Sequence, residues 1–83
     1  MEIKVLGTGC AKCNKLYEQV VQAVAKADVQ ADVSKVEKLD QIMAYGVMMT
    51  PALVVDGDVK SVGKVPKVDQ IVTWLTDVAS KGS

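Results

Sequence analysis

The sequence predicts an α/β domain in which a four-stranded mixed sheet carries three helices, in the order β-α-β-α-β-β-α. Two observations predict this class. Strand-like and helix-like hydrophobic patterns alternate along the first half of the chain, and the turn signal Asp56-Gly57 joins the last two strand-like segments. Elements in that order bury the apolar stripes of the helices against a sheet. With 83 residues there is room for one hydrophobic core, so we expect a single domain over 1–83, with residues from about 80 to 83 as a frayed tail.

The first half of the chain predicts a strand–helix–strand unit. The apolar run at residues 3–6 ends at Gly7, which indicates a short strand. Residues 11–27 carry apolar side chains at helical spacing, and residues 29–36 alternate between apolar and polar side chains, as in a half-buried strand. Because one helix connects the two strands, we expect them to be parallel, with a right-handed crossover.

The second half predicts a short helix, a hairpin and a closing helix. Residues 37–45 have helical spacing and are followed by Gly46, which suits the C-terminal end of a helix. Residues 52–55 and 58–62 are strand-like and lie on either side of the turn signal, so these two strands are expected to be antiparallel. Residues 68–79 then carry the apolar stripe of an amphipathic helix.

Composition excludes several classes of function. Ten basic and ten acidic residues give a net charge of zero, and only three aromatic residues are present, so the chain lacks the basic surface typical of nucleic-acid binding. No apolar run approaches the ~18 residues of a membrane span, and no secretory signal pattern is present. We therefore expect a cytoplasmic monomer with no nucleic-acid or membrane partner. The sequence contains no histidine, the commonest general base and metal ligand.

Both cysteines, Cys10 and Cys13, lie where the first strand gives way to the first helix. Residues three apart on a helix share a face, about 5–6 Å apart at Cβ, and small adjustments bring two cysteines to disulfide distance. The free N–H groups at a helix N-terminus favour an anion, so the thiol of Cys10 is expected to ionise more readily than a free cysteine. Cys10 would then attack a substrate disulfide and Cys13 would resolve the mixed disulfide. Gly9, Ala11 and Lys12 complete this turn, with Lys12 adding positive charge.

Other interpretations use the same two cysteines. A structural disulfide closing so short a loop would remove little chain entropy and stabilise little. A copper- or zinc-binding carrier is the stronger alternative, because this cysteine spacing is also half of a zinc site. Zinc prefers four ligands, however, and the chain offers two thiolates and no imidazole. Copper chaperones share a Gly-x-x-Cys-x-x-Cys segment after a first strand, but they end in a strand rather than in a helix.

Two segments together resemble the small prokaryotic thioredoxin-like proteins, also called redox-active disulfide proteins, which are similar to thioredoxin and glutaredoxin. The segments are Gly-Cys-Ala-Lys-Cys at residues 9–13 and residues 45–57, which contain Thr50-Pro51. The resemblance covers nearly the whole chain. It implies a thioredoxin-like fold, thiol–disulfide oxidoreductase activity without a cofactor, and protein disulfide substrates and an upstream disulfide reductase as partners.

The segment Thr50-Pro51 is the second candidate site. From the residues alone, Pro51 fits either a cis-proline loop or the start of an edge strand. The resemblance implies that the bond is cis, that it lies beside the dithiol, and that the backbone of Thr50 pairs with an extended substrate segment. A third hypothesis is an adaptor protein that binds partner peptides at this site without catalysing disulfide exchange. Three methionines near the loop, Met43, Met48 and Met49, are expected to fill the core, and a flexible apolar rim for partner proteins is the less favoured alternative.

Overall fold

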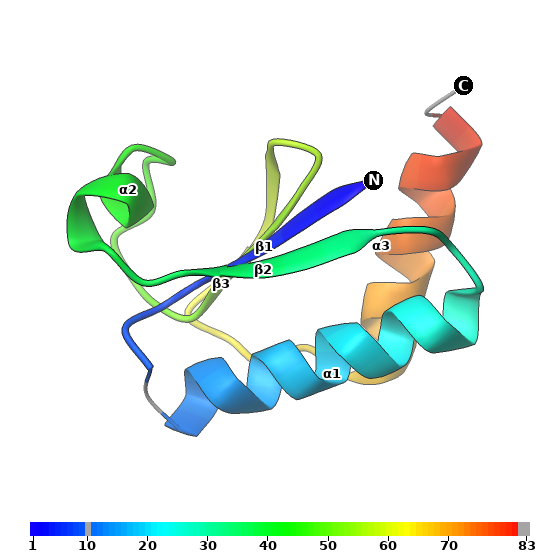
Figure 1. Cartoon of the computed structure of the whole chain (residues 1–83), viewed down its shortest axis with the longest axis horizontal. Coiled ribbons are helices and arrows are strands. Elements are labelled where there is room, and N and C mark those ends of the chain that lie inside the picture. Colours follow the sequence, from blue (N-terminus) through cyan, green and yellow to red (C-terminus); the bar gives the residue numbers. More distant parts are fainter. Residues whose placement is uncertain (10, 82–83) are drawn as a thin grey trace.

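The computed structural model describes residues 1–9 and 11–81 (Figure 1). Within these residues, four strands and three helices follow in the order β-α-β-α-β-β-α, which confirms the predicted fold class. The elements are β1 (Glu2–Leu6), α1 (Ala11–Ala27), β2 (Asp32–Val36), α2 (Leu39–Met43), β3 (Ala52–Val55), β4 (Asp58–Val62) and α3 (Val68–Lys81). Helix α3 therefore includes residues 80–81 of the expected tail, and residues 82–83 lie outside the described part of the chain.

The strands form one mixed sheet in the order β2-β1-β3-β4. Strand β1 is parallel to β2 and antiparallel to β3, and β3 is antiparallel to β4. The parallel pair follows from the α1 crossover, and the β3–β4 pair follows from the tight turn at Asp56 and Gly57, both of which have positive φ. Strands β1 and β3 are central, and β4 is an edge strand.

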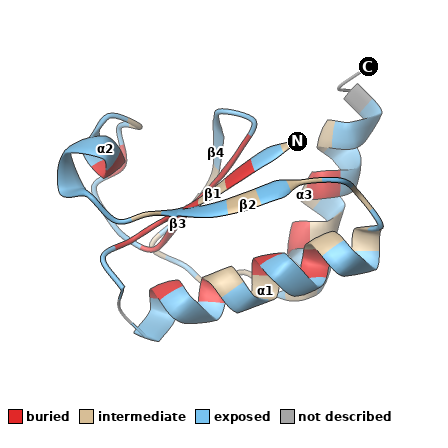
Figure 2. Cartoon of the chain, in the orientation of Figure 1, coloured by how far each residue is buried: buried red, intermediate tan, exposed pale blue. Residues whose placement is uncertain are grey.

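Helices α1 and α3 pack together on one face of the sheet, and α2 lies on the other face at one end (Figure 1). Because side chains alternate along a strand, β1 and β3 supply residues to both faces. The α1–α3 face buries Ile3, Val5, Leu53 and Val55 with Leu16, Val20, Ala23, Ile71 and Leu75. The α2 face buries Leu6, Ala52 and Val54 with Ile42 and Val47. Figure 2 shows β3 buried along its whole length, as expected for a central strand.

Two elements are shorter than the sequence pattern predicts. Strand β2 begins at Asp32 rather than at residue 29, because its register pairs Asp32 with Glu2, the first residue of β1. Residues 29–31 thus have no β1 residue to pair with, although Val29 and Ala31 still pack against the core. Helix α2 covers Leu39–Met43 rather than residues 37–45, and the chain leaves it through Gly46 with φ +77°.

An exposed ion pair joins the two helices of the larger face. The Nζ of Lys26 on α1 lies 2.6 Å from the Oδ1 of Asp69 in the first turn of α3. The hydrogen bond and charge of Lys26 lower the pKa of Asp69 below its usual value of 3.8, and the charge of Lys67 adds to this shift. Both side chains are largely exposed, so the contribution of the pair to folding is small.

This pair makes folding stability depend on pH in a defined direction. A carboxyl group with a lowered pKa in the folded state stabilises the fold above its unfolded pKa, and this stabilisation is lost as pH falls through the folded pKa. Asp69→Asn is therefore expected to lower the urea midpoint slightly at neutral pH. The difference should vanish below the lowered pKa, and it should be smaller in a Lys26→Gln background, where only the charge of Lys67 still lowers the pKa of Asp69. A difference in urea midpoint between the unmodified protein and the Asp69→Asn variant that persists in strong acid would contradict this assignment.

Candidate functional site

The candidate site lies where β1 ends and α1 begins. Gly7 follows β1 directly, is buried, and donates its backbone N–H to the carbonyl of Val36 at 2.9 Å. Helix α1 then begins at Ala11 and places Cys13 in its first turn. The Cys13 side chain is only 4% exposed, and its sulfur takes part in a disulfide. Cys10 lies outside the described residues.

A close backbone approach at Gly7 brings two of the candidate residues to one place. A Cβ built on Gly7 would overlap the Sγ of Cys13 and lie 3.0 Å from its Cβ. The same position is 4.0 Å from the Cβ of Thr50. Cys13 and Thr50, which are 37 positions apart in the sequence, therefore both lie next to the end of β1. Only glycine leaves the sulfur of Cys13 the space that it occupies.

The Thr50–Pro51 segment also contributes to the site. It lies immediately before β3 in the chain. The bond between the two residues is cis. Pro51 is buried, whereas Thr50 is exposed. The carbonyl of Pro51 accepts a hydrogen bond from the N–H of Gly63 at 2.8 Å, which ties the loop to the end of β4. The fold thus holds the proline in place and leaves Thr50 accessible to a partner.

The methionines around this loop do not fill the core, contrary to the sequence expectation. Met43, Met48 and Met49 are 63%, 96% and 62% exposed. Helix α2 is only five residues long and turns Ile42, not Met43, toward the sheet. Met49 instead lies over Gly63. A Cβ added to Gly63 would be 3.0 Å from the Cε of Met49. The surface next to Thr50 is therefore apolar and made of flexible side chains.

The three supporting residues of the predicted turn are accessible. Gly9 is exposed and has a φ of +84°. Ala11 and Lys12 are also exposed, in the first turn of α1. The left-handed backbone at position 9 favours glycine, which explains this residue just before the helix. Positive charge at Lys12 lies near the helix N-terminus, where an anion would be favoured.

Lys4, the only charged residue within the apolar part of β1, is not part of this site. It lies within 3.0 Å of Glu2 and 5.9 Å from the centre of the Tyr45 ring. A hydrogen bond to Tyr45, followed by the hydrogen bond and charge of Glu2, raises the pKa of Lys4. The side chain is thus held protonated among groups on the α2 side, away from Cys13.

Sequence reasoning missed the role of Gly7. A glycine after an apolar run ordinarily signals a turn, so the sequence predicts only that a strand ends at Gly7. The contact that requires glycine here is with a side chain six residues later, and no local pattern encodes that distance. The one feature of the sequence that hints at this contact is the short spacing between the end of the first strand and Cys13.

The arrangement of strands, helices and proline loop is that of a thioredoxin-like domain. Residues 1–76 match the thioredoxin domain family. The chain is 37% identical over 76 residues to the thioredoxin of Methanothermobacter thermautotrophicus, a match that covers 92% of this chain and 99% of that protein. It is 38% identical over 69 residues to the thioredoxin of Methanocaldococcus jannaschii, which covers 83% of this chain and 79% of that protein.

This chain therefore belongs to the thioredoxin domain family and is a thioredoxin-like redox protein. The metal-carrier alternative has no support. Within residues 1–9 and 11–81, no three side chains of the metal-binding types come together. In the same part of the chain, no helix has the length and apolar character needed to cross a membrane.

Proposed function

We propose that this protein is a dithiol–disulfide oxidoreductase in which Cys10 is the attacking thiolate and Cys13 the resolving thiol. The observation that carries the proposal is the disulfide state of Cys13 beside the Thr50–Pro51 loop. Cys10 is the only other cysteine in the sequence, so it is the partner that an intramolecular disulfide requires.

The difference in accessibility within the site supports these roles. Cys13 is nearly fully buried and packed against Gly7. A client disulfide on another protein cannot reach a sulfur in that position without displacing the end of β1. The first attack is therefore assigned to Cys10, whose sequence neighbours Gly9 and Ala11 are exposed. Cys13 is placed for the second, intramolecular step.

The reaction is two successive thiol–disulfide exchanges. The Cys10 thiolate attacks one sulfur of the client disulfide, the client S–S bond breaks, and one client thiolate leaves. Cys13, after losing its proton, attacks the Cys10 sulfur and releases the second client thiolate. Two electrons pass to the client, and Cys10 and Cys13 end as a disulfide. An upstream disulfide reductase returns both cysteines to thiols.

Activation of Cys10 requires no histidine, and the sequence has none. The N-terminus of α1 offers backbone N–H groups without intrahelical partners, and its dipole favours a negative charge. Lys12, exposed in the first helical turn, adds a positive charge of modest, salt-screened effect. These groups lower the cost of forming a thiolate at position 10.

Client recognition centres on Thr50. In this proposal its backbone pairs with an extended client segment, and Met48 and Met49 contact apolar client side chains beside it. Flexible methionines accommodate clients of different shape, which suits an enzyme with several protein substrates. The partners are thus protein disulfides and an upstream reductase, and we place the activity of this 1–83 domain, as a monomer, in the cytoplasm.

The test is a redox titration of the two thiols. The protein is equilibrated in dithiothreitol buffers of graded potential, quenched with an alkylating reagent, and weighed intact by mass spectrometry. Both cysteines should become resistant to alkylation together, in one two-electron transition and in a monomeric product. Cys13→Ser should stay fully alkylated at Cys10 across the same range. Independent titration of the two thiols, or a disulfide-linked dimer as the main oxidised product, would overturn the proposal.

A further inference from the structure

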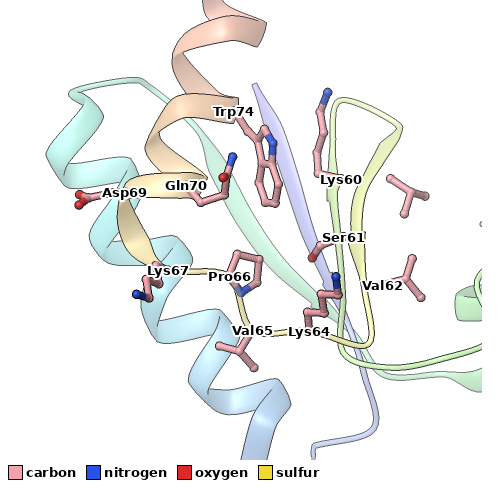
Figure 3. Close-up of a pocket in the computed structure, with 11 residues that line it drawn as sticks. Lys60, Ser61, Val62, Lys64, Val65, Pro66, Lys67, Asp69, Gln70 and Trp74 are labelled. Atoms are coloured by element: carbon pink, nitrogen blue, oxygen red, sulfur yellow. The ribbon is translucent and has the colours of Figure 1, made fainter.

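A groove separates the edge strand β4 from α3, outside the candidate redox site (Figure 3). Its volume of about 870 Å³ lies in the range of ligand-binding pockets. Val65, Pro66 and Trp74 give it an apolar wall, and all three are partly buried. Figure 3 shows the Trp74 ring opposite β4, with Lys60 and Lys64 on the side of β4. The groove thus joins an aromatic surface to positive charge.

Positive charge dominates the lining. The charged residues are Lys60, Lys64, Lys67 and Asp69. The carboxylate of Asp69 is already paired with Lys26, whose Nζ lies 2.6 Å away. Asp69 therefore offsets little of the charge of the three lysines. In a chain with zero net charge, this local excess indicates an anionic occupant.

A buried hydroxyl also faces this groove. The Oγ of Ser61 lies in the lining and is inaccessible, and within the described residues it has no hydrogen-bond partner. Buried polar atoms are nearly always satisfied in folded proteins. Because this hydroxyl has no exposed surface, it does not identify the occupant, which is argued from the charged and apolar side chains of the lining.

The edge of β4 itself is poorly suited to pairing with another strand. The β3–β4 register shifts between Leu53 and Val54, so that Lys60 is an extra residue on β4. Bulges and lysines on edge strands are the usual obstacles to strand addition. Recognition in this groove therefore depends on side chains rather than on backbone pairing along β4.

We infer that this groove docks an acidic segment of a partner protein, with carboxylates on Lys60 and Lys64 and an apolar side chain against Trp74 and Pro66. The groove lies near the Thr50–Pro51 loop, because Val62 in its lining pairs with Ala52, the residue after Pro51. A partner held there would reach the Thr50–Pro51 loop. The link to disulfide exchange rests on the proposed function, whereas the docking itself does not.

Trp74 provides a direct test because it is the only tryptophan in the chain. Its fluorescence is titrated with the peptide acetyl-Glu-Glu-Leu-Glu-Glu-amide and with the matched peptide acetyl-Lys-Lys-Leu-Lys-Lys-amide. The acidic peptide should cause a saturable change that weakens as salt is raised, and the basic peptide should cause none. No saturable change with the acidic peptide, or equal changes with both peptides, would overturn the inference.

A pair of charge-matched variants locates the site. Lys60→Gln/Lys64→Gln should weaken binding of the acidic peptide by about 3- to 30-fold, the loss expected for two exposed ion pairs. Lys15→Gln/Lys38→Gln removes the same charge outside the groove and should bind within about 2-fold of the unmodified protein. Equal weakening in the two variants would show binding through overall charge and contradict a defined groove.

This readout involves no thiol chemistry, so the two proposals fail separately. Intact disulfide exchange without peptide binding would overturn the docking groove alone. Saturable peptide binding in a protein whose cysteines do not form a reversible disulfide would overturn the proposed function alone.

Discussion

Replacing Cys10 with serine is expected to reduce the rate of disulfide reduction by about 10³-fold or more. The loss is of this order because the variant lacks the nucleophile, and a serine hydroxyl is not ionised near neutral pH. Cys13 cannot substitute for it, since its side chain is 4% exposed and packed against Gly7. The measurement is the rate at which the variant accelerates reduction of insulin disulfides by dithiothreitol.

The result depends on a folded variant, which thermal unfolding of Cys10→Ser would establish. The change replaces one sulfur atom with one oxygen atom, so stability in the reduced state should change by less than about 1 kcal/mol. A folded Cys10→Ser protein that reduces insulin at the original rate would show that the first attack uses another group.

Gly7→Ala is expected to have the second large effect, on both stability and exchange. The added Cβ overlaps the Cys13 sulfur, and neither the strand end nor the first turn of α1 can move without loss of packing. Overpacking of this kind costs about 1–3 kcal/mol. Because the displaced atom is the sulfur proposed to resolve the mixed disulfide, exchange should also slow, by about 10-fold or more. Urea unfolding and insulin reduction measure the two effects.

Gly46→Ala is the matched control. Its φ of +77° makes an alanine unfavourable there by about 1–2 kcal/mol, but no atom lies within 4 Å of the added Cβ. Both variants should therefore lose stability, while only Gly7→Ala should slow exchange. If the two proteins exchange disulfides at the same rate, the contact between Gly7 and Cys13 has no functional role.

The sequence was sufficient to predict the order of the elements because the hydrophobic periods change clearly along the chain. The helix at Ala11–Ala27 and the strands at 52–55 and 58–62 have the bounds that the pattern predicts. The register of the sheet could not be read from the pattern. Strand β2 begins three residues later than the alternation suggests, because its first residue pairs with the first residue of β1. The start of β2 thus depends on strand pairing rather than on local composition.

The site was predictable only in part. The cysteines and Thr50-Pro51 stand out as motifs, but the proximity of Cys13 to Thr50 depends on how β1, α1 and β3 are placed in space. The contact of Gly7 with Cys13 and the exposure of Met48 follow from that placement and have no local signal. The groove beside Trp74 combines residues from β4, α3 and the connection between them, and it appears only once α3 has packed beside the edge of the sheet.

The family relationship and the geometry support one mechanism from different directions. The matched relatives are named thioredoxins, and the match extends over residues 1–76. Independently, the fold leaves Thr50 accessible and buries Cys13 within the same small region. A buried cysteine next to an accessible loop provides the asymmetry that the proposed two-step exchange requires.

The most direct test of this asymmetry is to trap the first intermediate. Cys13→Ser protein is mixed with a peptide that contains one disulfide, and the covalent product is digested and sequenced by mass spectrometry. We expect a stable mixed disulfide with the peptide sulfur joined to Cys10, while Cys10→Ser protein under the same conditions forms none. An adduct on Cys13 in the Cys10→Ser protein, or no adduct on Cys10 in the Cys13→Ser protein, would contradict the assignment of Cys10 as the attacking thiolate.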